Sequence, residues 1–207
     1  MDGVLFKTIN YARQKFLEKH PGVTEEMYND IHTGNYHKGA EKYAHLKIQE
    51  TPQEEKDRQN RYWVQKTATP LVGGMHDLLQ FLRDNNFVIT LNTNAKESNC
   101  VPLLQKSGAY DFFDFITTSN TTRDKVEKFK IIKDRYNVES DECFFVTDAL
   151  GDVRDSGIVA IPTVAVTWGV HGRMYFNQSE HSHLIAVVDT VSELRGVIDN
   201  HYGKMTT

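Results

Sequence analysis

Cysteine, proline and tryptophan are scarce in this chain of 207 residues, which contains two, five and two of them respectively. The two cysteines, Cys100 and Cys143, lie in unrelated contexts without metal-ligand spacing, so neither a disulfide framework nor a cysteine-based metal site is predicted. We expect both thiols to be reduced and buried in the core. Reduced cysteines favour a cytoplasmic location.

Long apolar runs and an excess of basic residues are also missing. No stretch approaches the roughly 20 apolar residues that cross a bilayer, and the N-terminus lacks the layout of a signal peptide. Lys and Arg number 24 against 28 Asp and Glu, giving a formal net charge of −4 that disfavours binding to nucleic acid or to an anionic membrane. A small-molecule substrate is therefore predicted.

Several common site motifs are absent as well. The chain contains no Gly-x-Gly-x-x-Gly, no P-loop and no serine-hydrolase elbow, which argues against dinucleotide, P-loop and serine-hydrolase chemistry. His181 and His183 are close in sequence but lie in a polar stretch without a third ligand, so a zinc site is not predicted. With 39% hydrophobic and 25% charged residues, the composition is that of an ordinary globular protein.

Residues 8–69 have a polar, helical pattern without strand-like alternation. Thr51 begins one helix of this stretch, with Pro52 at the first helical position and Glu54 placed to close a capping box. The stretch is predicted to be a small all-helical module.

After Pro70 the pattern changes to apolar strands that alternate with helices, which is typical of a parallel sheet covered by helices. Strands are predicted at 87–91, 112–117, 143–147, 161–167 and 184–188, and helices at 75–82, 101–106, 126–136 and after a cap at 190–193. The predicted fold class is therefore α/β, with the helical module inserted near its start.

Four segments carry residues suited to phosphoryl-transfer chemistry: 1–6, 89–94, the region of Lys125, and 144–152. Thr93 and Asn94 follow a buried strand, where ligands gather in open parallel sheets. Asp148 and Asp152 follow another strand, and clustered acids at a sheet edge suit Mg²⁺.

Each segment also has a simpler interpretation. Asp2 and Gly3 alone form a common turn, and Thr93 alone could begin a loop. A lysine such as Lys125 is usually solvated on a helix, and paired acids can cap the helix that follows a strand. The order of all four segments favours the functional interpretation over these alternatives.

In order, spacing and flanking pattern, the four segments resemble the haloacid dehalogenase superfamily. The resemblance extends over nearly the whole chain and implies a three-layer, Rossmann-like parallel-sheet core with an inserted α-helical cap. The core would comprise residues 1–7 and 70–207, and the cap would comprise residues 8–69.

The resemblance also implies roles for individual residues. Asp2 maps onto the acid/base, and its main-chain carbonyl would contact Mg²⁺. Thr93 and Asn94 map onto the phosphate-binding residues. Lys125 maps onto the lysine that holds the phosphoryl group, with Lys128 as its competitor. Asp148 would be a direct ligand of Mg²⁺, and Asp152 would support the metal site.

The family pattern Asp-x-Asp-Gly places a nucleophilic aspartate before Met1, and no residue of the chain maps onto it. The first strand, central in the family's sheet, is missing with it, which would leave two unpaired inner strand edges. One hypothesis is that the native protein starts upstream of Met1. The other is a catalytically silent relative that binds Mg²⁺ or a phosphorylated ligand.

The resemblance predicts a Mg²⁺-dependent phosphatase that hydrolyses a small phosphorylated metabolite through an aspartyl-phosphate. Asp2 favours a phosphatase or a mutase over a dehalogenase, and a sugar-phosphate mutase is the alternative within the superfamily. The residues expected to face the substrate are His32, Asn35, Tyr36 and Trp168. The sequence does not predict an oligomeric state.

Overall fold

The computed structural model describes residues 1–177 and 181–202. Residues 8–69 are helical, as predicted, and form their own small hydrophobic cluster around Phe16, Tyr28 and Ile31. The elements of this helical segment are α1 (Ile9–Lys19), α2 (Glu25–Ile31), α3 (Tyr36–Glu41), η1 (Ala44–Leu46) and α4 (Pro52–Ala68). Its division from the core as a separate domain stays a prediction.

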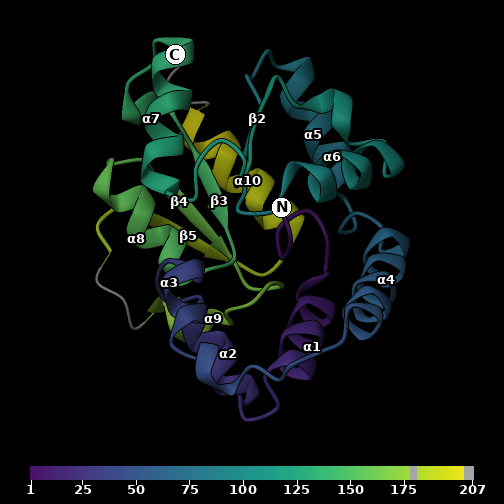
Figure 1. Cartoon of the computed structure of the whole chain (residues 1–207). Helices are drawn as coiled ribbons and strands as arrows, with labels where there is room; N and C mark the ends of the chain where they lie inside the picture. The colour runs from purple at the N-terminus through teal and green to yellow at the C-terminus, as the bar shows by residue number, and fades with distance from the viewer. Residues whose placement is uncertain (178–180, 203–207) are drawn as a thin grey trace.

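Residues 70–177 and 181–202 contain the strands, and Figure 1 shows α1–α3 below the labelled strands and α4 at the right of the view. Helices and strands alternate, so the predicted α/β fold is confirmed. The elements are α5 (Met75–Asp84), β1 (Thr90–Asn92), α6 (Glu97–Lys106), η2 (Tyr110–Phe112), β2 (Phe115–Thr117), α7 (Lys125–Tyr136), η3 (Ser140–Glu142), β3 (Phe145–Thr147), α8 (Leu150–Ile158), β4 (Thr163–Val166), α9 (Arg173–Asn177), β5 (Leu184–Val188) and α10 (Val191–Tyr202).

Local sequence signals set several helix boundaries. The capping box at the start of α4 is confirmed, because Thr51 Oγ1 accepts a hydrogen bond from Glu54 N and the Glu54 side chain accepts one from Thr51 N. The predicted cap of α10 is also confirmed, since Glu193 N donates to Thr190 Oγ1 over 3.1 Å. Asn137 ends α7 in the left-handed conformation, which asparagine tolerates better than most residues.

All strand pairs in the two sheets of the described residues are parallel. One sheet has the order β1-β2 and the other the order β3-β4-β5. β5 covers 184–188 as predicted, whereas β1 to β4 are shorter than predicted: β1 covers 90–92 instead of 87–91, and β2 begins only at Phe115. Because β1 and β2 pair only with each other, their ladder ends where the three residues of β2 end.

The larger sheet is covered by helices on both faces. Every residue of β4 is buried, and successive side chains alternate between two clusters. Val164 and Val166 pack with Leu194 and Ile198 of α10, whereas Ala165 packs with Val153 of α8. Figure 1 shows α8 and α10 on opposite sides of these strands, which explains why β4 is an uninterrupted apolar run.

The two sheets are not hydrogen-bonded to each other, so β1 and β3 each have one unpaired edge. A cavity of about 1130 Å³ reaches between them and is lined by Leu91 and Asn92 of β1 and by Phe145 and Val146 of β3. Asn92 is buried there, and its Oδ1 atom has no hydrogen-bond partner within residues 1–177 and 181–202.

The two connections between the core and the helical segment run side by side. Phe6 and Leu71 form an antiparallel bridge, and Val72 N donates to Leu5 O over 2.9 Å. The helical segment is thus connected to the core at one place, through two adjacent stretches of the polypeptide. No helix within residues 1–177 and 181–202 is both long and apolar enough to cross a membrane.

The main core predicts a clear effect of truncating a buried leucine. Leu104 is fully buried in α6, and Leu104→Ala should lower the free energy of unfolding by about 2 to 5 kcal/mol, because it removes packed methyl groups and leaves a cavity. Ile158→Ala is the control, since Ile158 is 70% exposed and its truncation should change stability by no more than about 0.5 kcal/mol. Urea unfolding measures both, and equal losses would contradict this description of the core.

Candidate active site

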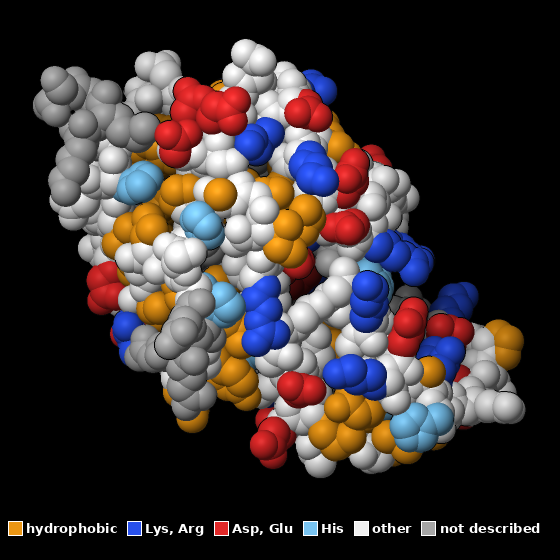
Figure 2. Space-filling view, turned by 90° about the vertical axis from the view of Figure 1, so that its left-hand side faces the viewer, with side chains coloured by type: hydrophobic (Ala, Val, Ile, Leu, Met, Phe, Trp, Pro, Cys, Tyr) orange, Lys and Arg blue, Asp and Glu red, His pale blue; other side chains and the backbone are white. Residues whose placement is uncertain are grey.

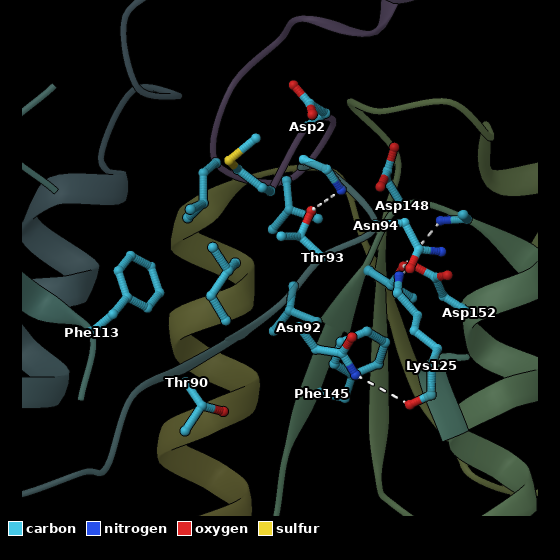
Figure 3. A pocket seen from close by; sticks show the side chains of 18 of the residues that line it. Asp2, Thr90, Asn92, Thr93, Asn94, Phe113, Lys125, Phe145, Asp148 and Asp152 are labelled. Atoms are coloured by element: carbon cyan, nitrogen blue, oxygen red, sulfur yellow. Dashed lines mark hydrogen bonds and ion pairs between the residues drawn. The ribbon is translucent and has the colours of Figure 1, made fainter. Parts of the chain in front are cut away.

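The predicted site residues meet in one cavity, at the ends of β1 and β3. Asp2, Thr93, Lys125, Asp148 and Asp152 all line it. Figure 3 shows their side chains gathered at the carboxyl ends of the strands, with Asp2 and Asp148 close to each other. Figure 2 shows a hollow on the molecular surface with acidic side chains inside it and basic side chains near its edge.

The Asp148 carboxyl group is enclosed by two glycines. A Cβ atom on Gly3 would lie 1.8 Å from Asp148 Oδ2, and one on Gly169 would lie 2.1 Å from Asp148 Cβ, so no side chain fits at either position. Gly3 also has a φ of 77°, which favours glycine. Asp148 Oδ2 accepts a hydrogen bond from Val170 N over 2.8 Å. Burial raises the pKa of Asp148 to about 6, and the charge of Asp152 acts in the same direction.

Asp152 is paired with a lysine. Its Oδ2 atom accepts hydrogen bonds from the Lys125 ammonium and, over 2.7 Å, from Thr147 Oγ1. Burial alone would raise the pKa of Asp152, but the adjacent Lys125 holds it below its ordinary value. Asp152 is therefore a carboxylate at neutral pH, and Lys125 is placed beside the same cavity.

Asp2 is held by the helical segment. Its carboxylate accepts a hydrogen bond from Lys66 Nζ over 2.8 Å and another from Thr8 Oγ1. Lys66 is buried in α4. Burial acts to raise the pKa of Asp2, yet the Lys66 ammonium lowers it below its usual range. An ion pair between the core and the helical segment thus keeps Asp2 ionised.

Lys128 has a different place from Lys125. It is fully buried, and its ammonium donates to Thr93 O and to Asn94 Oδ1, both over 2.6 Å. Burial, followed by the charge of Lys125, lowers the pKa of Lys128 to about 8. Lys125 lines the cavity and Lys128 does not. Lys128 therefore fixes the loop that carries Thr93 and Asn94, whereas Lys125 is the lysine within reach of a ligand.

The four residues expected to face the substrate separate into two pairs. His32 and Tyr36 line the cavity, whereas Asn35 and Trp168 do not. Asn35 Oδ1 caps α3 by accepting from His37 N and Lys38 N, and Trp168 Nε1 donates to Val4 O over 3.1 Å. Specificity roles for all four stay predictions, and the geometry favours the first pair.

The helical segment is docked against the start of α8. Gly151 N donates to His32 O over 2.9 Å, and Arg154 donates to Thr33 O over 2.6 Å. The approach is so close that a Cβ atom on Gly151 would lie 2.3 Å from Gly34 O. Only glycine at position 151 allows this contact, which closes one side of the cavity.

The sequence analysis missed the basic residues that α1 and α4 bring to the cavity, including Lys66. Arg58, Tyr62 and Lys66 are the three buried residues of α4, and they recur at intervals of four. That spacing places them on one helix face. Two basic residues on the inner face of a polar helix are a signal for a buried ion pair or an anion site, and this periodicity could have identified them.

The predicted Mg²⁺ site uses two carboxylates, Asp148 and Asp152, and the main-chain carbonyl of Asp2. Among the described residues no group of three or more His, Cys, Asp or Glu side chains is placed to hold a metal ion. The Asp2 carboxylate itself is bound to Lys66 and Thr8. Asp148 is buried without an ion pair in the described part of the chain. Mg²⁺ commonly uses one or two carboxylates together with substrate phosphate and water, which the pair of Asp148 and Asp152 can supply.

Two comparisons address the family. A family model described as haloacid dehalogenase-like hydrolase matches residues 1–154. No curated protein matches the chain.

Solved structures with a similar fold cover almost the whole chain. A predicted phosphatase from Clostridium acetobutylicum is 18% identical with a TM-score of 0.76, covering 97% of this chain and 95% of that one. A β-phosphoglucomutase from Clostridium difficile is 19% identical with a TM-score of 0.74, covering 99% and 95%. A predicted phosphoglycolate phosphatase from Haemophilus somnus is 15% identical with a TM-score of 0.70, covering 95% of each chain. At these identities the likeness shows the fold alone.

The buried imidazole of His32 gives a testable dependence of stability on pH. Burial lowers the pKa of His32 to about 4, whereas the unfolded chain protonates near 6.5. Between these values the unfolded state binds more protons, so the contribution of His32 to stability is present above pH 6.5 and is lost as the pH falls. Relative to His32→Gln, the free energy of unfolding should decrease by about 2 kcal/mol from pH 7.5 to pH 5.

Urea unfolding of both proteins at the two pH values measures this difference. Comparing the native chain with the variant cancels the contribution of all other titrating groups to the free energy of unfolding. NMR titration of the imidazole is the control. A His32 pKa at or above 6.5, or a difference that does not change with pH, would contradict the burial described here.

Proposed function

Because the chain belongs to the haloacid dehalogenase-like hydrolases, we propose that it carries the site of a Mg²⁺-dependent phosphomonoesterase for a small phosphorylated metabolite. The observation that carries the proposal is the convergence of Asp2, Thr93, Lys125, Asp148 and Asp152 around one cavity at the strand ends. Hydrolysis of a phosphomonoester needs a proton donor for the leaving alcohol and positive charge near the phosphoryl oxygens, and these residues are suited to both.

Asp2 is the proposed acid/base. It lies in the cavity, and Lys66 and Thr8 fix its carboxylate. A carboxyl group in this position can donate a proton to the leaving oxygen and later accept one from the attacking water. Because the Lys66 ammonium lowers the pKa of Asp2, the protonated form is the minor one. Asp2 must therefore take up a proton before it can donate one to the leaving oxygen.

Thr93, Asn94 and Lys125 are the proposed phosphate-binding residues. Lys128 holds Thr93 O and Asn94 Oδ1, which orients the Asn94 amide group and the loop around it. The Lys125 ammonium lies against Asp152 and can contact a phosphoryl oxygen while it keeps that partner. A fixed donor set of this kind requires little rearrangement when charge develops on the phosphoryl group.

Asp148 and Asp152 are the residues that would hold Mg²⁺. When bound, the ion would neutralise phosphoryl oxygens and orient the phosphate. The buried Asp148 carboxyl, whose pKa is raised to about 6, supports this assignment because a cation beside it would favour its ionised form.

The aspartyl-phosphate route is part of the proposal. In the family pattern the attacking aspartate stands two positions before Asp2. The unpaired edges of β1 and β3 and the cavity between them offer room for a strand that would end beside Asp148. A test of activity therefore compares the chain with a form that carries an apolar strand ending in Asp directly before Met1.

The same proposal includes the cap and the location. Residues 8–69 act as a cap that closes the site, with hinges where the two connecting chains run side by side. The free thiols of Cys100 and Cys143 support a cytoplasmic location. Nucleic acid and membranes are not among the proposed partners, in line with the net charge of −4.

A sugar-phosphate mutase is the second candidate. It uses the same residues and transfers the phosphoryl group to a second substrate position instead of to water. The fold shared with a β-phosphoglucomutase from Clostridium difficile supports this candidate. The cavity volume does not separate the two candidates, because it includes the space between β1 and β3. Product analysis separates the two, because release of inorganic phosphate supports the phosphatase and isomerised sugar phosphate supports the mutase.

The central experiment is a phosphatase screen of both forms with a panel of phosphomonoesters. We expect hydrolysis by the extended form, at least about 100-fold slower after Mg²⁺ is removed with EDTA and after Asp148→Asn, because the phosphate loses its charge partner. Asp141→Asn, in exposed η3, is the matched control and should leave the rate unchanged. Absence of hydrolysis by both forms, or a rate insensitive to EDTA, would reject the metal-dependent phosphatase.

Asp2→Asn tests the acid/base assignment separately. In the extended form this change should lower kcat by about 10²- to 10⁴-fold, because an amide cannot transfer the proton. KM should change little, since the phosphate donors stay in place. Asp77→Asn on the exposed side of α5 is the control. An unchanged kcat for Asp2→Asn with a poor leaving group would assign proton transfer to another residue.

A further inference from the structure

The part of the cavity formed by the helical segment is lined by basic side chains. They come from two helices that pack together, α1 and α4. The cations that line this part of the cavity are Lys15, Lys19, Arg58 and Lys66. Asp2 is the acidic residue that lines the cavity beside these four cations.

Three of these four cations have carboxylate partners. Lys66 is paired with Asp2 over 2.8 Å, Arg58 with Glu50 over 2.6 Å, and Lys19 with Glu50 over 3.1 Å. Each of these charges is therefore compensated within the protein, and none of them needs a ligand to be stable.

Lys15 differs from the other three. Its Nζ atom lies over the ring of Tyr62, 3.8 Å from the ring centroid, and within the described residues it forms neither an ion pair nor a hydrogen bond. The ring face attracts a cation but does not neutralise it. Burial, followed by the charges of Lys66 and Arg58, lowers the pKa of Lys15 to about 8. A positive charge is thus held in the cavity without an anionic partner.

The place of Lys15 relates it to the proposed reaction site. The Lys15 and Lys66 ammonium groups lie 3.8 Å and 5.5 Å from the same Tyr62 ring centroid, so they are no more than about 9.3 Å apart. Lys66 is bound to Asp2. Lys15 and the proposed acid/base are therefore close enough to be reached by two ends of one small metabolite.

We propose that Lys15, supported by the Tyr62 ring, binds a second anionic group of the substrate, a carboxylate or a second phosphate at the end opposite the phosphoryl group. The substrate class is then a phosphomonoester with two separate negative charges. The inference rests on the proposed function, because it assumes that the first phosphate binds near Thr93 and Lys125. The phosphate ester of an uncharged alcohol would leave the Lys15 charge uncompensated and would bind more weakly.

Binding measurements with three probes test this proposal. Calorimetric titration of the chain uses ethyl phosphate with one anionic group, 2-phosphoglycolate with an added carboxylate, and a short-chain bisphosphate with an added phosphate. We expect the second anion to tighten Kd by at least about tenfold, which corresponds to about 1.4 kcal/mol. Comparison of the last two probes shows whether a carboxylate or a phosphate is preferred.

Lys15→Met deletes the charge and keeps most of the apolar stem. This variant should bind ethyl phosphate as the native chain does and should lose the added affinity for the two probes that carry a second anionic group. Lys15→Arg should restore part of that added affinity. Lys56→Met is the matched control, since Lys56 is exposed on α4 and outside the cavity. Removing an uncompensated charge should not destabilise the fold, and urea unfolding of Lys15→Met checks this directly.

The outcomes separate this inference from the proposed function. Failure of ethyl phosphate and both other probes to bind the native chain would overturn the phosphate site and the subsite together. Binding of ethyl phosphate without any gain from a second anion would overturn only the role of Lys15. Equal weakening of all three probes by Lys15→Met would also overturn that role, because such a pattern indicates a general change in the cavity.

Discussion

The close packing of the Asp148 carboxyl group between two glycines is the contact on which the site depends. A methyl group at Gly3 or Gly169 would overlap Asp148, so the turn after Asp2 and the loop after β4 can approach only because both positions lack a side chain. This approach brings Asp2 to the end of β3, which is far from it in the sequence. The same packing removes water from Asp148, which is why its pKa rises to about 6.

The charges around Asp148 follow a consistent pattern. Asp152 is paired with Lys125 and Asp2 with Lys66, whereas Asp148 has a single backbone donor. Burying a carboxylate without a partner is costly. Among the described residues neither Asp148 nor Lys15 has an ion-pair partner in this cavity. A ligand of opposite charge would therefore stabilise the charged form of each.

Much of the fold was accessible from the sequence because it depends on local pattern, whereas the place of Asp2 beside the other aspartates was predicted from the family resemblance. Alternation of apolar strands and helices predicted the parallel sheets, and the positions after predicted strands gave Thr93 and Asp148. Contacts between the helical segment and the core were not accessible in this way. The partner of Asp2 lies 64 residues away on α4, and the choice between Lys125 and Lys128 depends on the depth of each side chain. Strand ends were misplaced because ladder length depends on the partner strand.

The ion pair between Asp2 and Lys66 links the chemistry of the core to the position of the helical segment. Burial acts to raise the pKa of Asp2, and the Lys66 ammonium is the main influence that reverses this effect. Because Lys66 belongs to α4, it lowers the pKa of Asp2 only while α4 lies against the core. If the helical segment moves away, Asp2 loses its cation but also gains water, and these two changes oppose each other. The proton affinity of Asp2 therefore depends on the position of the helical segment as well as on the residues of the core.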